Sequence, residues 1–187
     1  SPHFVFNNGK LSKLLSKKLS NLKFLHLDPL DDSRYIGKGA IEFRSSDNFC
    51  DALNLISLKE GIQLHITEEH CPSFPIVFSH IFTSECESNL ISPRISIKVD
   101  KNLKVDILEQ FQYRSLQERS FTLNNVTEIT LEANASLEYV QLQNTSTPTL
   151  HLNTVKANLY SNAKLNVVNF TYGGELSRNN FFVNLQE

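Results

Sequence analysis

The sequence has no excess of charge of either sign and no long hydrophobic run. Its 187 residues include 18 Lys and Arg against 20 Asp and Glu, giving a formal net charge of −2. A nucleic-acid-binding protein is expected to carry a broad basic surface, and a membrane-spanning helix needs about 18 consecutive apolar residues. Neither occurs, so the sequence predicts no nucleic-acid partner and no membrane partner. A chain of this length can bury roughly 70% of its unfolded surface and hold a core without disulfides.

Cysteine is scarce, and the cysteines that are present are widely separated. Cys50, Cys71 and Cys86 form neither an even disulfide framework nor a Cys-x-x-Cys metal pair, which predicts a reducing, cytoplasmic compartment. Asn-x-Ser/Thr triplets, which mark glycosylated loops in secreted proteins, keep a secreted alternative open. They begin at Asn125, Asn134, Asn144 and Asn169.

Residues 1–46 are interpreted as an N-terminal strand/helix segment and linker. The chain begins at Ser1 without an initiator Met or a signal sequence, as expected of a fragment rather than a secretory precursor. Phe4–Lys10 predicts a short strand that runs into an Asn-Gly turn. Leucines at helical spacing, with lysines on the other faces, predict a docking helix over Leu11–Leu22; a membrane-surface helix is the alternative. The linker is marked by Asp28, Pro29, Asp31, Asp32, Gly37 and Gly39.

Residues 47–61 predict a helix that leads into the core. Ser46 or Asp47 can cap its N-terminus, and Gly61 follows its end. The apolar positions recur at the i, i+3, i+4, i+7 spacing of an amphipathic helix. They are Phe49, Ala52, Leu53 and Ile56.

Residues 62–187 change to a hydrophobic period of 2, which predicts strands with one buried face. No Asn-Gly or Asp-Gly hairpin signal occurs there, whereas asparagine, which tolerates left-handed backbone at single-residue corners, is frequent. The segment from Asn134 matches the segment from Asn162 at an offset of 28 residues. The expected fold is therefore mainly β, a parallel β-helix. Its core would stack Leu137 on Leu165 and Val140 on Val168.

Short motifs in a fixed order resemble the SufB/SufD family of the SUF iron–sulfur cluster assembly scaffold, and its SufD branch in particular. The most specific motif is Gly-Gly-x-x-x-Arg-Asn, formed by Gly173, Gly174, Arg178 and Asn179. The SufB branch shares this motif, whereas the N-terminal Asn-Gly segment favours SufD. The other matching segments are Ala52–Asn54, Gly61–Ile66, Pro75–Ile76, Ser92–Arg94 and Val126–Ile129.

This resemblance implies a right-handed parallel β-helix that serves as a non-catalytic scaffold subunit. It implies a SufB-like partner and a SufC-like ATPase recruited through a C-terminal helical domain, in a bacterial cytoplasm or a plastid. The iron–sulfur cluster would be assembled by the whole complex, with no cofactor in this fragment. Because family members continue beyond Glu187, the β-helix is expected to be truncated there and to self-associate through its open coil. That coil would carry Phe181, Val183 and Leu185.

The Gly-Gly-x-x-x-Arg-Asn signature has two interpretations. In the structural one, the glycines permit a bend, and Arg178 and Asn179 hydrogen-bond buried corner carbonyls. In the functional one, the four residues form a polar channel or subunit contact for sulfur or iron. The five donors of Arg178 favour the structural interpretation.

The spacing of the histidines and cysteines indicates neither a metal site nor a catalytic site. His70 and Cys71 are the one adjacent pair of soft metal ligands, and no second pair stands at ligand spacing. His65 and His80 lie in polar phases of their strands and are expected at the surface. Neither a metal site nor a catalytic site is predicted.

The alternative function is a secreted β-helix protein, either carbohydrate-active or adhesive. A carbohydrate-active site of this kind needs clustered carboxylates for calcium beside an Arg base. Asp100 and Asp106 stand alone in the sequence. Three carboxylates converging on Arg94, Arg114 or Arg178 would support this alternative.

Overall fold

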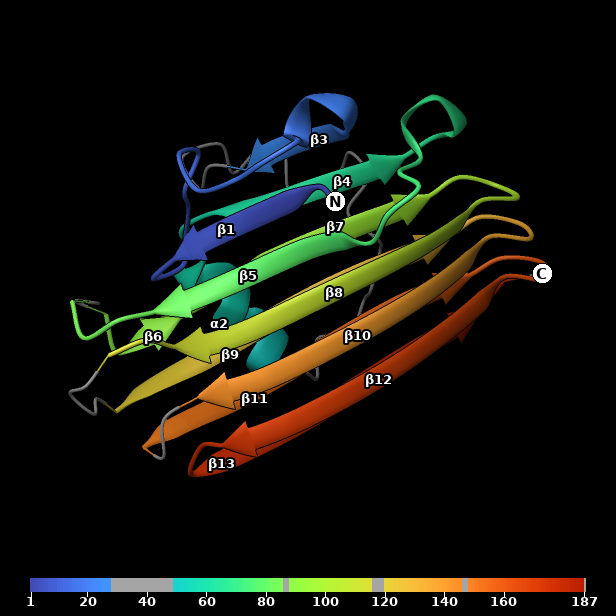
Figure 1. Ribbon diagram of the computed structural model, residues 1–187. Helices are drawn as coiled ribbons and strands as arrows, with labels where there is room; N and C mark the ends of the chain where they lie inside the picture. The colour runs from blue at the N-terminus through green and yellow to red at the C-terminus, as the bar shows by residue number, and fades with distance from the viewer. Residues whose placement is uncertain (28–48, 86–87, 116–119, 146–147, 187) are drawn as a thin grey trace.

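The computed structural model describes residues 1–27, 49–85, 88–115, 120–145 and 148–186 as two stacked sheets (Figure 1). Sheet A has the order β12-β10-β8-β5-β1-β2, and sheet B has the order β13-β11-β9-β7-β4-β3, with β6 paired to β9. The sheet A strands are β1 (His3–Asn7), β2 (Lys10–Leu11), β5 (Ile76–Phe82), β8 (Lys104–Tyr113), β10 (Ser136–Thr145) and β12 (Lys164–Gly173). The sheet B strands are β3 (Lys23–Leu27), β4 (Gly61–Ile66), β6 (Leu90–Ile91), β7 (Arg94–Val99), β9 (Phe121–Leu131), β11 (Thr149–Leu159) and β13 (Leu176–Leu185).

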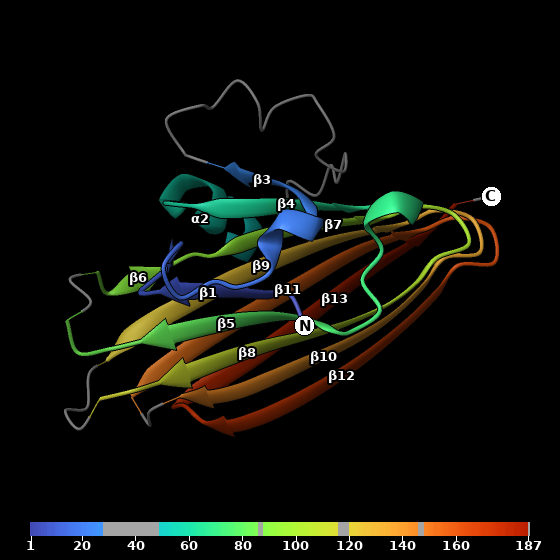
Figure 2. The ribbon, with the colours of Figure 1, turned by 45° about the horizontal axis from the view of Figure 1, so that its top comes forward.

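From β7 onward the chain alternates between the two sheets, and each strand pairs in parallel with the strand one coil later. The result is a parallel β-solenoid of about three turns, which confirms the predicted fold class. Figure 2 shows the strands of successive coils lying side by side in both sheets. The described part of the chain contains no helix with the length and apolar character needed to cross a bilayer.

Asparagine forms the corners at one end of the coils, as its frequency predicts. Asn102, Asn134 and Asn162 have φ values of 63°, 59° and 57°. Their side chains also stack: Asn134 Nδ2 donates to Asn102 Oδ1 at 3.0 Å, and Asn162 Nδ2 donates to Asn134 Oδ1 at 3.3 Å. The corner residue of each coil is thus bonded to the corner of the next.

The apolar core lies between the sheets, and the 28-residue repeat sets its register. Leu137 pairs with Leu165 and Val140 with Val168, as expected. Only the leucines face the core, because residues three apart on a strand point to opposite sides. The prediction that Val140 and Val168 stack in the core is therefore wrong; Val168 is 36% exposed on the outer face.

The leucine-rich segment does not form the predicted helix. It contains β2, a turn and the short 3-10 helix η1 (Leu19–Asn21), preceded by Lys18 with left-handed backbone. His3 and Lys17 bond to each other through both backbone groups at 2.9 Å, which holds the segment against β1. Leu22 is buried in the core, whereas Leu14 is 91% exposed. Packing of a few leucines onto the core overrides the helical pattern.

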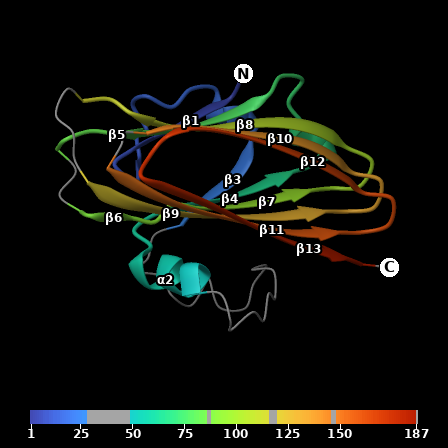
Figure 3. The same cartoon turned by 90° about the horizontal axis from the view of Figure 1, so that it is seen from below.

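Helix α2 (Phe49–Ser57) lies where the helix was predicted, but it buries its polar face instead of its apolar stripe. It lies outside sheet B and buries Cys50, Asp51 and Asn54, while Phe49 and Ile56 of the apolar stripe are exposed (Figure 3). The proposed caps and the linker residues fall within 28–48, outside the described residues. Gly61 begins β4 instead of ending the helix.

The last layer, β12 and β13, exposes more apolar surface than the others. Phe181, Val183 and Leu185 are 46%, 55% and 76% exposed. Self-association through these side chains stays a prediction.

The register predicts different costs for two valine substitutions. Val105→Ala removes two methyl groups from a 2% exposed core position and should lower the free energy of unfolding by about 2 kcal/mol. Val168→Ala, on the outer face, should cost less than about 1 kcal/mol. Urea denaturation of both variants measures the difference, and equal costs would contradict the assigned faces.

Candidate functional site

Part of the solenoid interior is polar, and it lies between the main apolar core and a smaller apolar cluster that includes Phe82, Phe111 and Leu123. Eight side chains, each at most 2% exposed, converge there from β5, β8, β9, β10 and β11. We call them the interior polar network: His80, Glu109, Asn125, Tyr139, Gln141, Gln143, His151 and Asn153. They point inward through the same period-2 alternation that directs the apolar residues to the core.

The network centres on a buried pair, His80 and Glu109. His80 Nε2 lies 2.8 Å from Glu109 Oε1, and the His80 ring is stacked between Phe6 and Phe111 at centroid distances of 4.7 and 4.6 Å. The prediction that His80 is a surface residue is therefore wrong. On β5 it shares the inward phase of two phenylalanines, and this was the sequence signal for its burial.

The second oxygen of Glu109 is also satisfied. Tyr139 OH donates to it, and Gln141 Nε2 donates to it at 2.9 Å. Burial alone would raise the pKa of Glu109, but the hydrogen bond and charge of His80, with the bonds from Tyr139 and Gln141, hold it below its usual value. Burial and the nearby Glu109 charge raise the pKa of Tyr139 well above normal. The network thus holds a carboxylate in its ionised form.

Two facing ladders of polar side chains, all of them amides except Glu109, extend the network along the solenoid. Glu109, Gln141 and Asn169 are in register on sheet A, and Asn125, Asn153 and Asn179 are in register on sheet B. Asn125 Nδ2 donates to Asn153 Oδ1 at 2.6 Å, and Asn153 Nδ2 donates to Asn179 Oδ1 at 2.8 Å. The ladders are joined by Asn153 Nδ2, which also donates to Gln141 Oε1 at 2.8 Å.

His151 packs beside these ladders. Its Nε2 lies 2.5 Å from Asn125 Oδ1, and its Nδ1 bonds to Gln143. Burial lowers the pKa of His151 to about 4, and the charge of Glu109 only partly opposes this shift. His65, by contrast, is a half-buried outer residue whose Nε2 lies 2.8 Å from Asp100 Oδ1.

The signature residues are divided between two environments. Gly173 and Gly174 form the corner between β12 and β13 with φ values of 68° and 80°. Asn179 faces inward and ends the asparagine ladder, whereas Arg178 is exposed and donates from Nε to Asn180 Oδ1 at 3.1 Å. The expected bonds from Arg178 to corner carbonyls are absent from its described contacts. The functional role of the signature stays a prediction.

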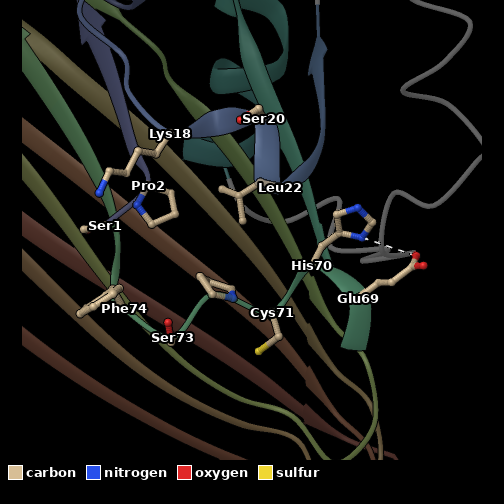
Figure 4. Close-up of a pocket in the computed structure, with 11 residues that line it drawn as sticks. Ser1, Pro2, Lys18, Ser20, Leu22, Glu69, His70, Cys71, Ser73 and Phe74 are labelled. Atoms are coloured by element: carbon tan, nitrogen blue, oxygen red, sulfur yellow. Dashed lines mark ion pairs between the residues drawn. The ribbon is translucent and has the colours of Figure 1, made fainter.

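His70 and Cys71 line an open surface cavity of about 590 Å³ near the N-terminus (Figure 4). His70 is directed toward Glu69, at 4.0 Å, while the Cys71 sulfur points away from both. Burial raises the pKa of the Cys71 thiol, which keeps it protonated near neutral pH. Within the described ranges, no three His, Cys, Asp or Glu side chains are placed to hold a metal ion together.

Arg94 is part of a second buried polar group, beneath α2. We call Asp51, Arg94, Glu128 and Lys156 the ionic cluster. Arg94 contacts the carboxylates of Asp51, at 3.0 Å, and Glu128, and Lys156 contacts Asp51. All four residues are at most 7% exposed, so the cluster is closed to a sugar chain. The sequence singled out Arg94 but not its partners; charged positions within strongly apolar strands were the available signal.

Two of the four glycosylation triplets do not fit the positions of their asparagines, whereas Asn134 and Asn144 are exposed. Asn125 is 1% exposed and Asn169 faces inward in the amide ladder. A glycan on Asn125 would have to occupy the interior polar network. The triplets at Asn125 and Asn169 therefore give no support to the secreted alternative.

Comparison with protein families gives one match. Residues 81–187 match the family described as "SUF system FeS cluster assembly, SufBD core domain". The matched region includes all of the interior polar network except His80. No curated protein was found to match the chain.

The low pKa of His151 predicts a pH dependence of stability. In the unfolded chain this histidine takes up a proton near pH 6.5, but in the folded protein it does so only near pH 4. The contribution of His151 to the free energy of unfolding should therefore be constant above pH 6.5. It should fall by about 3 kcal/mol as the pH drops to 4. Urea denaturation should show this slope reduced in His151→Gln and retained in the control His65→Gln. An unchanged slope in His151→Gln would exclude His151 as its source.

The geometry at the corner glycines predicts that Gly173→Ala lowers thermal stability more than Gly174→Ala. A Cβ at Gly173 would lie 2.2 Å from the carbonyl oxygen of Thr145, whereas one at Gly174 would meet its nearest atom, Gln143 Nε2, at 3.2 Å. Both backbones are left-handed, so each alanine carries about 1 kcal/mol of strain, and Gly173→Ala adds a backbone clash. Thermal unfolding should show a clearly lower midpoint for Gly173→Ala than for Gly174→Ala. Equal midpoints would contradict this corner geometry.

Proposed function

The chain belongs to the SufBD core domain family of the SUF iron–sulfur cluster assembly system, and from this premise we propose that it is a SufD-like scaffold subunit. Family membership gives it a role in SUF cluster assembly. The proposal adds that it acts with a SufB-like subunit and a SufC-like ATPase in the cytoplasm or a plastid. The family match over residues 81–187, which include all of β6–β13, is the observation that carries it.

The N-terminal segment supports SufD over SufB. Phe4–Gly9 resembles the opening of SufD, and here it forms β1 and a two-residue turn with Asn8 and Gly9 in left-handed backbone. β1 pairs with β5, so this segment continues sheet A. The feature that favours SufD is therefore integral to the solenoid.

The interior polar network supports a scaffold role rather than catalysis. The His80–Glu109 pair is enclosed by side chains of both sheets, and a catalytic acid or base must reach its substrate within hydrogen-bond distance. The network's hydrogen bonds join successive coils and make the solenoid rigid, which suits a scaffold subunit. No cofactor is assigned to this chain; the cluster is the product of the complex.

Genetic complementation tests the proposal. The full-length gene that includes this sequence should restore the activity of an iron–sulfur enzyme in a bacterial strain that lacks SufD, and its product should copurify with SufB and SufC. The same gene should fail in a strain that lacks SufB. Rescue of the SufB strain alone would contradict the SufD assignment, and rescue of neither strain, despite normal protein levels, would contradict the scaffold role.

A further inference from the structure

Helix α2 docks on sheet B through its polar face. Asp51 and Asn54 are 7% and 0% exposed, whereas Phe49 and Ile56 of the apolar stripe are 74% and 85% exposed. Amphipathic helices of globular proteins normally bury the apolar stripe. Figure 3 shows α2 as a separate layer below sheet B.

Specific polar contacts replace the missing apolar ones. Asp51 accepts bonds from Arg94 and Lys156, and thereby links α2 to β7 and β11. Asn54 Nδ2 donates to the carbonyl oxygens of Pro93 and Asn124, at 3.0 and 2.7 Å. The side chain of Asn124 in turn donates to the Cys50 carbonyl at 2.8 Å.

Such contacts hold a helix less firmly than the sheets hold each other. The desolvation cost of a buried ion pair offsets most of its Coulombic gain, so the net stabilisation by the ionic cluster is small while the pairs are intact. Removal of one partner, however, leaves an uncompensated buried charge. The solenoid strands have continuous parallel ladders of up to eleven paired residues and an apolar core, which α2 lacks. Elements with few buried apolar contacts open at lower free energy than the core.

We propose that α2 is a latch that opens while the solenoid stays folded, and that Asp51 holds it closed. In the open state Arg94, Glu128 and Lys156 on the outer face of sheet B become accessible to water. Opening also uncovers the Cys50 side chain, which is 6% exposed in the closed state. The thiol therefore reports on the latch.

Thiol labelling measures the opening. In a Cys71→Ser, Cys86→Ser background, Cys50 is the sole thiol, and its reaction rate with a disulfide reagent in excess reports the open fraction. Asp51→Asn should raise this rate about tenfold or more, because it leaves Arg94 and Lys156 without their shared carboxylate. Asp106→Asn, a matched change at an exposed position of β8, should leave the rate unchanged. If Asp51→Asn does not fold, Lys156→Gln tests the same contact from the sheet side.

The control for global unfolding is Val105→Ala, which weakens the core far from α2. If the latch opens by itself, this substitution leaves the Cys50 rate unchanged although it lowers the denaturation midpoint. A rate that rises in proportion to the loss of global stability would overturn the proposal. An unchanged rate in the folded Asp51→Asn variant, or in Lys156→Gln used in its place, would overturn it as well.

Discussion

The structure depends on the in-register parallel pairing of its coils. Each inward side chain lies beside the same position of the next coil, so the register decides which side chains meet in the interior. Leu64, Ile97 and Ile129 form one apolar row in sheet B. A single polar residue in such a row would be buried without a partner, at a cost of about 1–3 kcal/mol. Polar residues therefore enter the interior together, either in a ladder such as Asn125, Asn153 and Asn179 or beside a polar partner in the next row, as His80 lies beside Glu109.

The two buried charged groups follow the same rule in different surroundings. Inside the solenoid, Glu109 has hydrogen-bond partners on the two neighbouring strands of sheet A, β5 and β10, so it can lose them only if coils separate. Beneath α2, the partners of Asp51 lie on another element, and separation of that one helix is sufficient. Burial of Glu109 is thus part of a rigid interior, whereas burial of Asp51 depends on a contact that one helix can break.

Sequence reasoning identified the periodic features and missed those that depend on tertiary packing. Alternation and the 28-residue repeat predicted the solenoid and the pairing of Leu137 with Leu165, because strand register is periodic. The sequence pattern could not show that His80 would lie between two aromatic rings, since one ring comes from β1 and the other from β8. The exposed stripe of α2 was missed for a related reason: the partners of Asp51 are distant in sequence. The ionic cluster and the interior polar network are visible only once the coils are stacked.

The corner asparagines have a consequence for how such a chain tolerates insertions and deletions. A one-residue insertion within a strand would turn the following side chains from the core to the outside. Asn102, Asn134 and Asn162 have the same left-handed backbone conformation. The strand after each of these corners therefore starts with the same side chains directed inward. A shift in the inward and outward alternation of side chains is then confined to the coil in which it arises. Gain or loss of a whole coil between two such corners would leave the alternation of every other coil unchanged.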